Sequence, residues 1–508
     1  MPNSSAESSS VSLRAVALVA AAALGQLLLL LWLQAVQTRI YGTSEEMDAY
    51  LCAAALPLVL GGILAAAAGT AIVPYYQEQR LRAGLTAADA AAVHIAGLLL
   101  ILGLALALAM FSAAADTIRV AYPDLTGRRL DVAAGLLKIL CWLTPLIALT
   151  GFLYGLWHAR QQFQWPALVG LVGPFITVLF VIAPPAPSIE RLAWGVLAGA
   201  IVGLAILLPG SVSAGALRHK AARSELLRFG AMTLPIFVGA AYSRLDMIVD
   251  RILAARLGEG NISQMAYAAR IVAAVATLTT SGLSVVIFPA LARHAAAGDM
   301  RQLRSDLSEG WRFLAVILIP VVGGIFVCGG MIVRALFEHG AFTAKDTAAV
   351  DLLMRLSLGF LVGTAVGEVA SRTLTALGRI WTVTLVGMLA FTAASAAKIA
   401  IVDRFSAPGL SATASISALL VSLTLVALLV IHGGRSDIQR LSITVLRSGL
   451  ASGLAILPGA WLMSFGTLAS VIAGIFSSIG TYVILLLILQ DEFARRAWLA
   501  VFPERAKT

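Results

Sequence analysis

Long apolar runs separated by short polar connections make up almost the whole chain. A run of about 18 or more apolar residues can cross the roughly 30 Å hydrocarbon core of a bilayer as a helix. A helix also satisfies its own backbone hydrogen bonds, as lipid requires. The pattern therefore predicts an all-α integral membrane protein with about 14 transmembrane helices. The predicted spans are 13–37, 49–74, 87–114, 131–157, 165–183, 192–211, 229–253, 265–290, 312–336, 349–376, 381–402, 410–431, 445–463 and 468–490.

Composition supports a membrane protein. Of the 508 residues, 60% are hydrophobic and only 12% are charged, whereas soluble domains have roughly 25% charged residues. Three cysteines (Cys52, Cys141 and Cys328) lie inside apolar runs without metal-binding spacing, so we expect buried thiols. The net charge of +10 is dispersed among short loops, a pattern that does not favour nucleic-acid binding.

The basic residues predict the orientation. They concentrate in the connections that follow even-numbered spans and after the last span, and cytoplasmic loops carry such an excess of Lys and Arg. We therefore expect a multi-pass membrane protein with both termini in the cytoplasm. The basic residues are Arg80, Arg82, Arg160, Arg218, Lys220, Arg223, Arg293, Arg301, Arg304, Arg379, Arg435, Arg440, Arg495, Arg496, Arg505 and Lys507.

The chain also repeats itself weakly. The segments 39–42 and 72–75 have counterparts at 256–258 and 287–290. Each repeat holds six spans, so both halves insert with the same orientation, and such parallel repeats are a transporter architecture with the substrate site between the halves. The expected domains are an N-terminal lobe (1–212, spans 1–6), a C-terminal lobe (213–432, spans 7–12) and two additional C-terminal spans with a cytoplasmic tail (433–508).

The seventh predicted span contains four charged residues, and ionisable groups inside a membrane are candidates for function. Arg244 and Arg251 fall on one helical face, and Asp246 and Asp250 fall together on nearly the opposite face. Two neighbouring carboxylates would hold a proton or a cation between them. Alternatively, Asp250 and Arg251 lie at the end of the span and are solvated.

Charged residues in three later spans have simpler interpretations. Arg270 opens the eighth span and either binds an anion or reaches the membrane interface. Glu368 and Arg372 are spaced i, i+4 and are expected to neutralise each other. Lys398 is placed near a span end, from which its ammonium would reach the interface.

The connection Arg39–Tyr50 holds an arginine and three acids in otherwise apolar surroundings. Glu46 and Asp48 could hold the metal of a membrane glycosyltransferase, border the outer mouth of a transporter, or form an ordinary polar loop. A glycosyltransferase would need a large extracytoplasmic loop or domain, and every predicted loop here is short. The transporter is the preferred interpretation, and we expect no enzymatic activity and no cofactor.

Several motifs resemble the MurJ/MviN lipid II flippases of the multidrug/oligosaccharidyl-lipid/polysaccharide exporter superfamily. The resemblance covers nearly the whole chain. The matching segments are ThrArgIleTyrGly (38–42), AspAlaTyr (48–50), LeuPro (56–57), IleValPro (72–74), MetAlaTyrAlaAlaArg (265–270), PheProAlaLeuAlaArg (288–293) and PheGluHisGlyAlaPheThr (337–343).

The resemblance implies two six-helix lobes around a cationic cavity, and alternating access that carries an undecaprenyl-diphosphate-linked saccharide to the outer leaflet. It matches Asp48 and Arg270 to functional residues of the family. With Arg39 and Arg244, these are the expected substrate-binding residues. Asp246 and Asp250 are the expected ion-coupling residues, for Na⁺, H⁺ or a response to the membrane potential. The resemblance also implies a location in the bacterial cytoplasmic (inner) membrane, and cell-envelope biosynthesis proteins are the expected partners.

Departures from the family pattern leave the cargo open. The family has arginines in its first span where this chain has Leu27 and Leu33. Near the middle of its second span it has an arginine and a glutamate where this chain has Gly61 or Gly62 and Ala66. A lipid-linked exopolysaccharide or oligosaccharide unit is therefore an alternative to lipid II. A drug/cation antiporter and a transport-inactive scaffolding relative are further alternatives.

Overall fold

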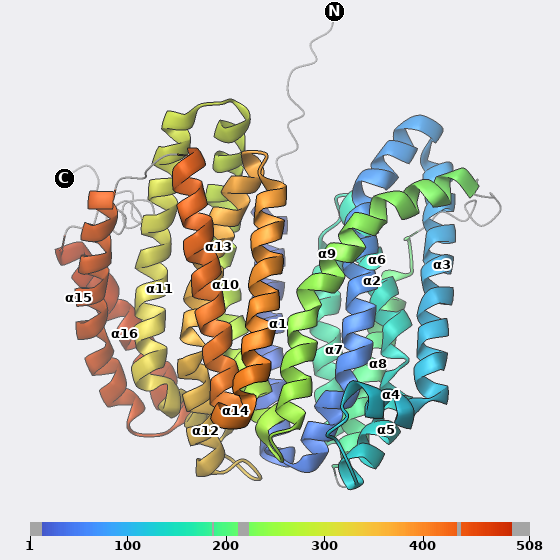
Figure 1. Cartoon of the computed structure of the whole chain (residues 1–508), viewed down its shortest axis with the longest axis horizontal. Helices are drawn as coiled ribbons and strands as arrows, with labels where there is room; N and C mark the ends of the chain where they lie inside the picture. The colour runs from blue at the N-terminus through green and yellow to red at the C-terminus, as the bar shows by residue number, and fades with distance from the viewer. Residues whose placement is uncertain (1–12, 185–186, 212–222, 434–437, 490–508) are drawn as a thin grey trace, which may run out of the picture. The chain divides into compact units, whose positions relative to one another are not determined.

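A computed structural model describes residues 13–184, 187–211, 223–433 and 438–489. The regular elements of these ranges are α-helices (Figure 1). They form two compact units, Met1–Gly260 and Asn261–Thr508. The first unit contains α1 (Leu13–Tyr41), α2 (Glu45–Ala83), α3 (Leu85–Ser112), α4 (Ala114–Ala121), α5 (Arg128–Leu140), α6 (Leu143–Ala159), α7 (Gln164–Ile182), α8 (Ile189–Leu207) and α9 (Arg223–Ala255). The second contains α10 (Asn261–Ala296), α11 (Met300–Phe337), α12 (Ala344–Leu356), α13 (Leu358–Ala376), α14 (Ile380–Gly433), α15 (Ile438–Met463) and α16 (Leu468–Ile488).

The predicted membrane architecture is confirmed. Within the described ranges, 12 helices are long and apolar enough to cross a membrane, and the number is 13 if α5 and α6, bent by 42° to each other, are counted as one span. Helix α14 has 54 residues, about 81 Å at 1.5 Å per residue, which is too long for a single crossing. It breaks at Ser406, where φ is 52°, and so contains two of the predicted spans. With α5 and α6 counted as one span and α14 as two, the described ranges agree with the fourteen predicted spans.

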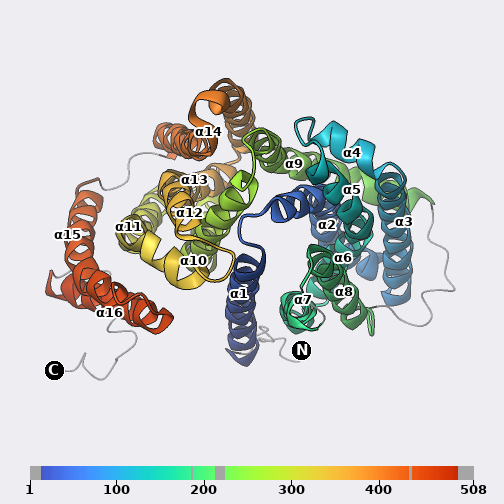
Figure 2. The ribbon, with the colours of Figure 1, turned by 90° about the horizontal axis from the view of Figure 1, so that it is seen from below.

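Helix α2 is the centre of the first unit. Ser44 caps its N-terminus by accepting a hydrogen bond from the Met47 amide. Acids in its first turn complement the positive end of the helix dipole. Glycines let α6 approach α2 closely, because a Cβ on Gly155 would collide with the Gly69 carbonyl oxygen. Figure 2 shows α7 beside α8 at the edge of this unit.

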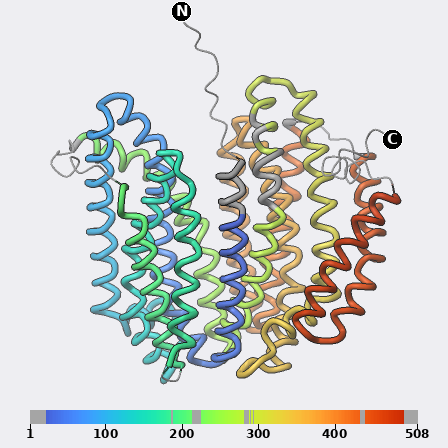
Figure 3. The backbone as a smooth tube through the Cα atoms, turned by 180° about the vertical axis from the view of Figure 1, so that it is seen from behind, coloured from blue at the N-terminus to red at the C-terminus, as the bar shows by residue number. Residues whose placement is uncertain are grey.

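The second unit is held together by close approaches and polar ties between helices. A Cβ on Gly363 of α13 would collide with the backbone of Ala418 in α14. The two additional helices pack against each other and α15 packs on α11; their adjacent courses are visible in Figure 3. The Tyr482 hydroxyl of α16 donates to the Val316 carbonyl of α11 at 2.7 Å.

The structure bears on the expected domain boundary and on the expected position of Lys398. The compact units divide at Gly260 because α9 packs with the first unit along α2. The repeat boundary between 212 and 213 lies outside the described residues and stays a prediction.

The expectation for Lys398 is wrong: its side chain is 0% exposed, so the ammonium lies inside the second unit instead of reaching the interface. Hydropathy alone could not distinguish these placements, because both leave a lysine in an apolar run.

Candidate functional site

Helix α9 runs antiparallel to α2 along its length, and charged side chains join the two. Near one end, Arg251 donates to the Leu51 carbonyl. Near the other, one Arg228 nitrogen contacts both Glu78 carboxylate oxygens at 2.6 and 2.7 Å. This pairing places the middle of α9 against the middle of α2.

Arg244 occupies that middle position. A Cβ placed on Gly62 would lie 2.8 Å from Nη1 of Arg244 and 2.9 Å from its Cζ, closer than real side-chain carbons approach. The guanidinium therefore lies where a larger residue would put its side chain. Arg244 and Arg251 both face α2, as their i, i+7 spacing predicts. In the part of the chain that the structure describes, Arg244 makes no hydrogen bond or ion pair.

Asp246 and Asp250 lie one helical turn apart on α9, and both are half-buried. The structure thus keeps the two carboxylates close along one helix, as their spacing predicts. Their proposed role in ion coupling stays a prediction.

Asp48 lies at the opposite end of α2 from the Arg228–Glu78 ion pair. Its side chain is 0% exposed. The Gly260 amide donates to Asp48 Oδ2 at 2.7 Å, and Arg129 Nη2 lies 3.6 Å from the same oxygen. Gly260 has φ of +83°, which only glycine adopts readily. The carboxylate therefore ties the connection after α9 to the start of α2.

The other predicted residues of this end have separate surroundings. Glu46 pairs with Arg128 at 2.9 Å, so Glu46 and Asp48 have different cationic neighbours. Arg39 is exposed in the last turn of α1. Gly62 lies 14 residues after Asp48, or about 21 Å along the helix. Arg39 and Asp48 therefore share the α1–α2 connection, whereas Arg244 lies deeper.

Arg270 is exposed on α10, in the second compact unit. The same unit carries the predicted Glu368–Arg372 pair, confirmed at 2.5 Å. The Arg372 guanidinium also lies 4.4 Å from the centre of the Phe288 ring. This arginine is neutralised and packed, as expected for a structural pair.

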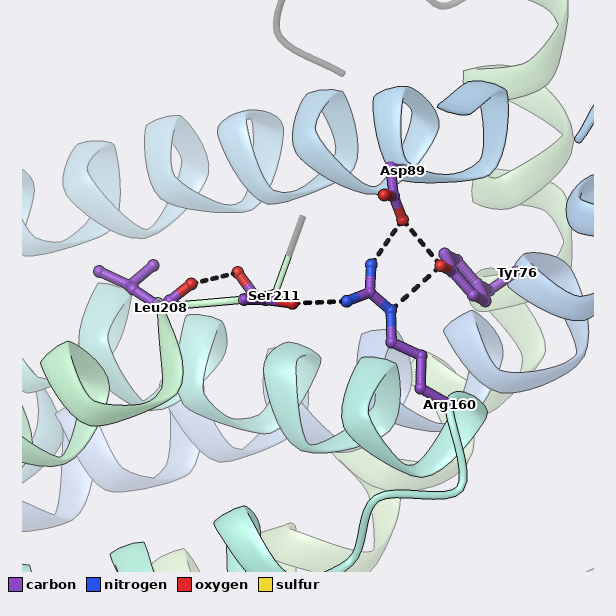
Figure 4. A network of polar contacts seen from close by, with 6 residues as sticks. Tyr76, Asp89, Arg160, Leu208 and Ser211 are labelled. Carbon is purple, nitrogen blue, oxygen red and sulfur yellow. Dashed lines mark hydrogen bonds and ion pairs between the residues drawn. The ribbon is translucent and has the colours of Figure 1, made fainter. Parts of the chain in front are cut away.

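A buried network at the far end of the first unit was missed by the sequence analysis. Arg160 contacts Asp89 at 2.5 Å and donates to the Tyr76 hydroxyl at 3.1 Å, and Tyr76 donates to Asp89 at 2.7 Å (Figure 4). The third Arg160 nitrogen donates to the Gly210 carbonyl at 2.7 Å. The sequence identified Arg160 only as a loop cation. Its partners Asp89 and Tyr76 lie 71 and 84 positions earlier in the chain, so no local spacing connects them.

An apolar groove of about 740 Å³ lies within the second unit, between α11, α13, α14 and α15. Branched aliphatic side chains and one indole line it. A groove of this composition suits hydrocarbon and offers few groups for a polar ligand. Its lining includes Trp311, Leu318, Val366, Val430 and Val445.

Comparison with known proteins now decides the family. The sequence model described as lipid II flippase MurJ matches residues 38–483. The chain belongs to this family. The resemblance seen in the sequence is confirmed, and the chain is a multi-pass protein of the bacterial inner membrane.

Relatives in the family are distant. Lipid II flippase MurJ of Burkholderia cenocepacia is 25% identical over 332 residues, which are 61% of this chain and 63% of the relative. A probable lipid II flippase MurJ of Rhizobium tropici is 21% identical over 329 residues, 62% of this chain and 61% of the relative. The chain thus spans less than two thirds of the length of the curated relatives it matches.

Solved structures confirm the fold over a longer range. Lipid II flippase MurJ in an inward closed conformation has a TM-score of 0.76 at 20% identity, covering 93% of this chain and 100% of that one. An inward-facing multidrug resistance MATE family transporter has a TM-score of 0.67 at 16% identity, covering 82% and 95%. The MurJ-family fold is therefore shared with a wider group of transporters.

Proposed function

We propose that this protein is a flippase that moves an undecaprenyl-diphosphate-linked saccharide from the inner to the outer leaflet by alternating access. The observation that carries the proposal is the family match over residues 38–483. Within the family the relatives are named lipid II flippases, so lipid II, the peptidoglycan precursor, is the first cargo to test. The protein acts in this proposal as a transporter and catalyses no bond cleavage.

The charges of the described residues fit such a cargo. A diphosphate loses water on entering a membrane protein and needs cationic donors, and guanidinium groups supply them in bidentate geometry. Arg39, Arg244 and Arg270 are the proposed donors. The apolar groove of the second unit offers a surface suited to a polyprenyl chain.

A second cargo is favoured by the missing arginines. Leu27, Leu33 and either Gly61 or Gly62 stand where the family pattern places basic residues, and Ala66 stands where it places an acid. A lipid-linked exopolysaccharide or oligosaccharide unit carries the same diphosphate with a different sugar. Coupling to Na⁺ or H⁺ through Asp246 and Asp250, or to the membrane potential, would drive either cargo outward. Association with cell-envelope biosynthesis proteins belongs to the same proposal.

Reconstitution tests the proposal. Purified protein is placed in vesicles with fluorescent undecaprenyl-diphosphate saccharides, and a membrane-impermeant quencher reports the leaflet of the label. We expect protein-dependent movement of lipid II, or of an exopolysaccharide carrier lipid if the cargo has changed. Protein-free vesicles and a labelled phosphatidylethanolamine are the controls. Movement of neither saccharide lipid above the protein-free rate would contradict the flippase.

A further inference from the structure

Two adjacent glycines near the middle of α2 face different neighbours. A Cβ on Gly61 would lie 3.0 Å from the Thr144 carbonyl oxygen, at the contact with α6. A Cβ on Gly62 would instead meet the guanidinium of Arg244 from α9. The first glycine serves helix packing, and the second makes room for a charge.

The charge lies near the middle of the long helix α2. Gly62 lies 17 residues after the start of α2 and 21 before its end, about 26 Å from the start at 1.5 Å per residue. A cation at such depth in a membrane span is costly unless it is compensated. The described part of the chain supplies Arg244 with no hydrogen-bond or ion-pair partner.

The neighbouring positions on the two helices carry no opposite charge either. The positions one turn away from Gly62 and Arg244 on their own helices are apolar: Leu58 and Ala66 on α2, and Ala240 and Ile248 on α9. The contact with Gly62 positions the guanidinium without engaging its N–H groups. The donors stay available for an anion, and guanidinium matches phosphate oxygens bidentately.

We infer that Gly62 and Arg244 together form a diphosphate-binding element within the first unit, in which Gly62 is the determinant that lets a cation from α9 take the place of an α2 side chain. The inference rests on the proposed function for the identity of the anion. The element needs one guanidinium beside position 62 of α2, and either α2 or α9 can supply it.

Moving the arginine from position 244 to position 62 tests whether either helix can supply the guanidinium. Arg244→Ala should weaken binding of undecaprenyl diphosphate by the purified protein in detergent roughly 10- to 100-fold, the range for a lost charged hydrogen bond, and binding of undecaprenyl monophosphate less. Gly62→Arg combined with Arg244→Ala should recover most of the binding. Gly97→Arg combined with Arg244→Ala is the matched control, because nothing lies within 4 Å of a Cβ on Gly97. It restores the net charge at a different place and should not recover binding.

Several outcomes are decisive. Wild-type affinity of Arg244→Ala for undecaprenyl diphosphate, or equal rescue by Gly62→Arg and Gly97→Arg, would overturn the inference. If the exchange variant does not fold, as judged by gel filtration and thermal unfolding, Arg244→Gln takes its place. This variant keeps the length and removes the charge, and unchanged selectivity for diphosphate over monophosphate would again overturn the inference.

The inference and the flippase proposal fail separately. Arg244-dependent diphosphate binding in a protein that moves no saccharide lipid would refute the flippase and support the binding element. Normal flipping by the wild type and by Arg244→Ala alike would refute the binding element and support the flippase.

Discussion

Charged residues of the first unit have two kinds of surroundings. Asp48 and Asp89 are 0% and 1% exposed, and an arginine lies near each carboxylate. Arg244 is half-buried against Gly62 and has no hydrogen bond or ion pair among the described residues. Breaking a buried pair is strongly destabilising because it leaves one charge uncompensated. We therefore expect the aspartates to stabilise the fold, whereas Arg244 supplies donors to the proposed anion-binding element.

Asp48 yields a stability prediction. Asp48→Ala removes the acceptor of the Gly260 amide and the carboxylate beside Arg129. We expect a loss of about 1–3 kcal/mol for a buried polar group deprived of its partner, seen as a lower thermal unfolding temperature in detergent. Asp48→Asn keeps an acceptor for the amide and should lose less. An alanine variant as stable as the wild type would show that Asp48 does not tie these segments.

Arg270 yields a transport prediction. Arg270→Ala should slow outward movement of the labelled saccharide lipid roughly 10-fold or more, the effect of losing a charged hydrogen bond, while expression and stability stay unchanged. Arg270→Lys should recover only part, because an ammonium lacks the bidentate fork. Arg372→Ala is the control in the same unit, since Arg372 is already paired with Glu368. Normal transport by Arg270→Ala would remove this residue from the site.

The sequence could identify charged residues but could not place all of their neighbours. Helical periodicity correctly put Arg244 and Arg251 on one face. It could not show that α2 lies opposite that face, since the contact joins positions 182 apart in the chain. Asp48 was recognised from a motif, whereas its partner Gly260 gave no local signal. Contacts between distant segments depend on packing, which one sequence does not display.

At the scale of helices, run length and apolar composition were sufficient to find the spans. The interruptions within spans were harder to predict. The bend between α5 and α6 follows from backbone geometry inside apolar sequence, so hydropathy does not change there. The break of α14 at Ser406 differs, because it lies in the polar connection between the predicted spans 381–402 and 410–431. The grouping of α9 with α2 likewise depends on side-chain contacts such as Arg228 with Glu78.

The network that joins α2, α3 and α6 gives a prediction at this scale. Arg160→Ala leaves the Asp89 carboxylate, 1% exposed, without its cation. Loss of one partner from a buried pair costs about 3–5 kcal/mol, so we expect a large fall in the unfolding temperature. Arg228→Ala is the comparison, because Arg228 and Glu78 are 39% and 31% exposed, and pairs that face solvent contribute about 0–1 kcal/mol. Equal effects of the two substitutions would contradict a special role for the network.

At the scale of the whole molecule, an even number of spans such as fourteen predicts both termini on one side of the membrane, and the loop charges predict that this side is the cytoplasm. Exposed positions at opposite ends of the first unit test this orientation. Thr126, between α4 and α5, should lie outside, and Ala83, at the end of α2, should lie inside. Ser44 and Ser188 are less suitable, because their hydroxyls cap α2 and α8.

Single cysteines at these two positions decide the orientation. An impermeant thiol reagent applied to intact cells should label Thr126→Cys and leave Ala83→Cys unlabelled until the membrane is permeabilised. The native cysteines are buried and give little background. The reverse labelling would move the arginine-rich connections outside and place the Asp48 end of α2 in the cytoplasm. The proposed direction of transport would then lose its structural basis, because Arg39 would lie at the leaflet where the saccharide lipid enters instead of where it leaves.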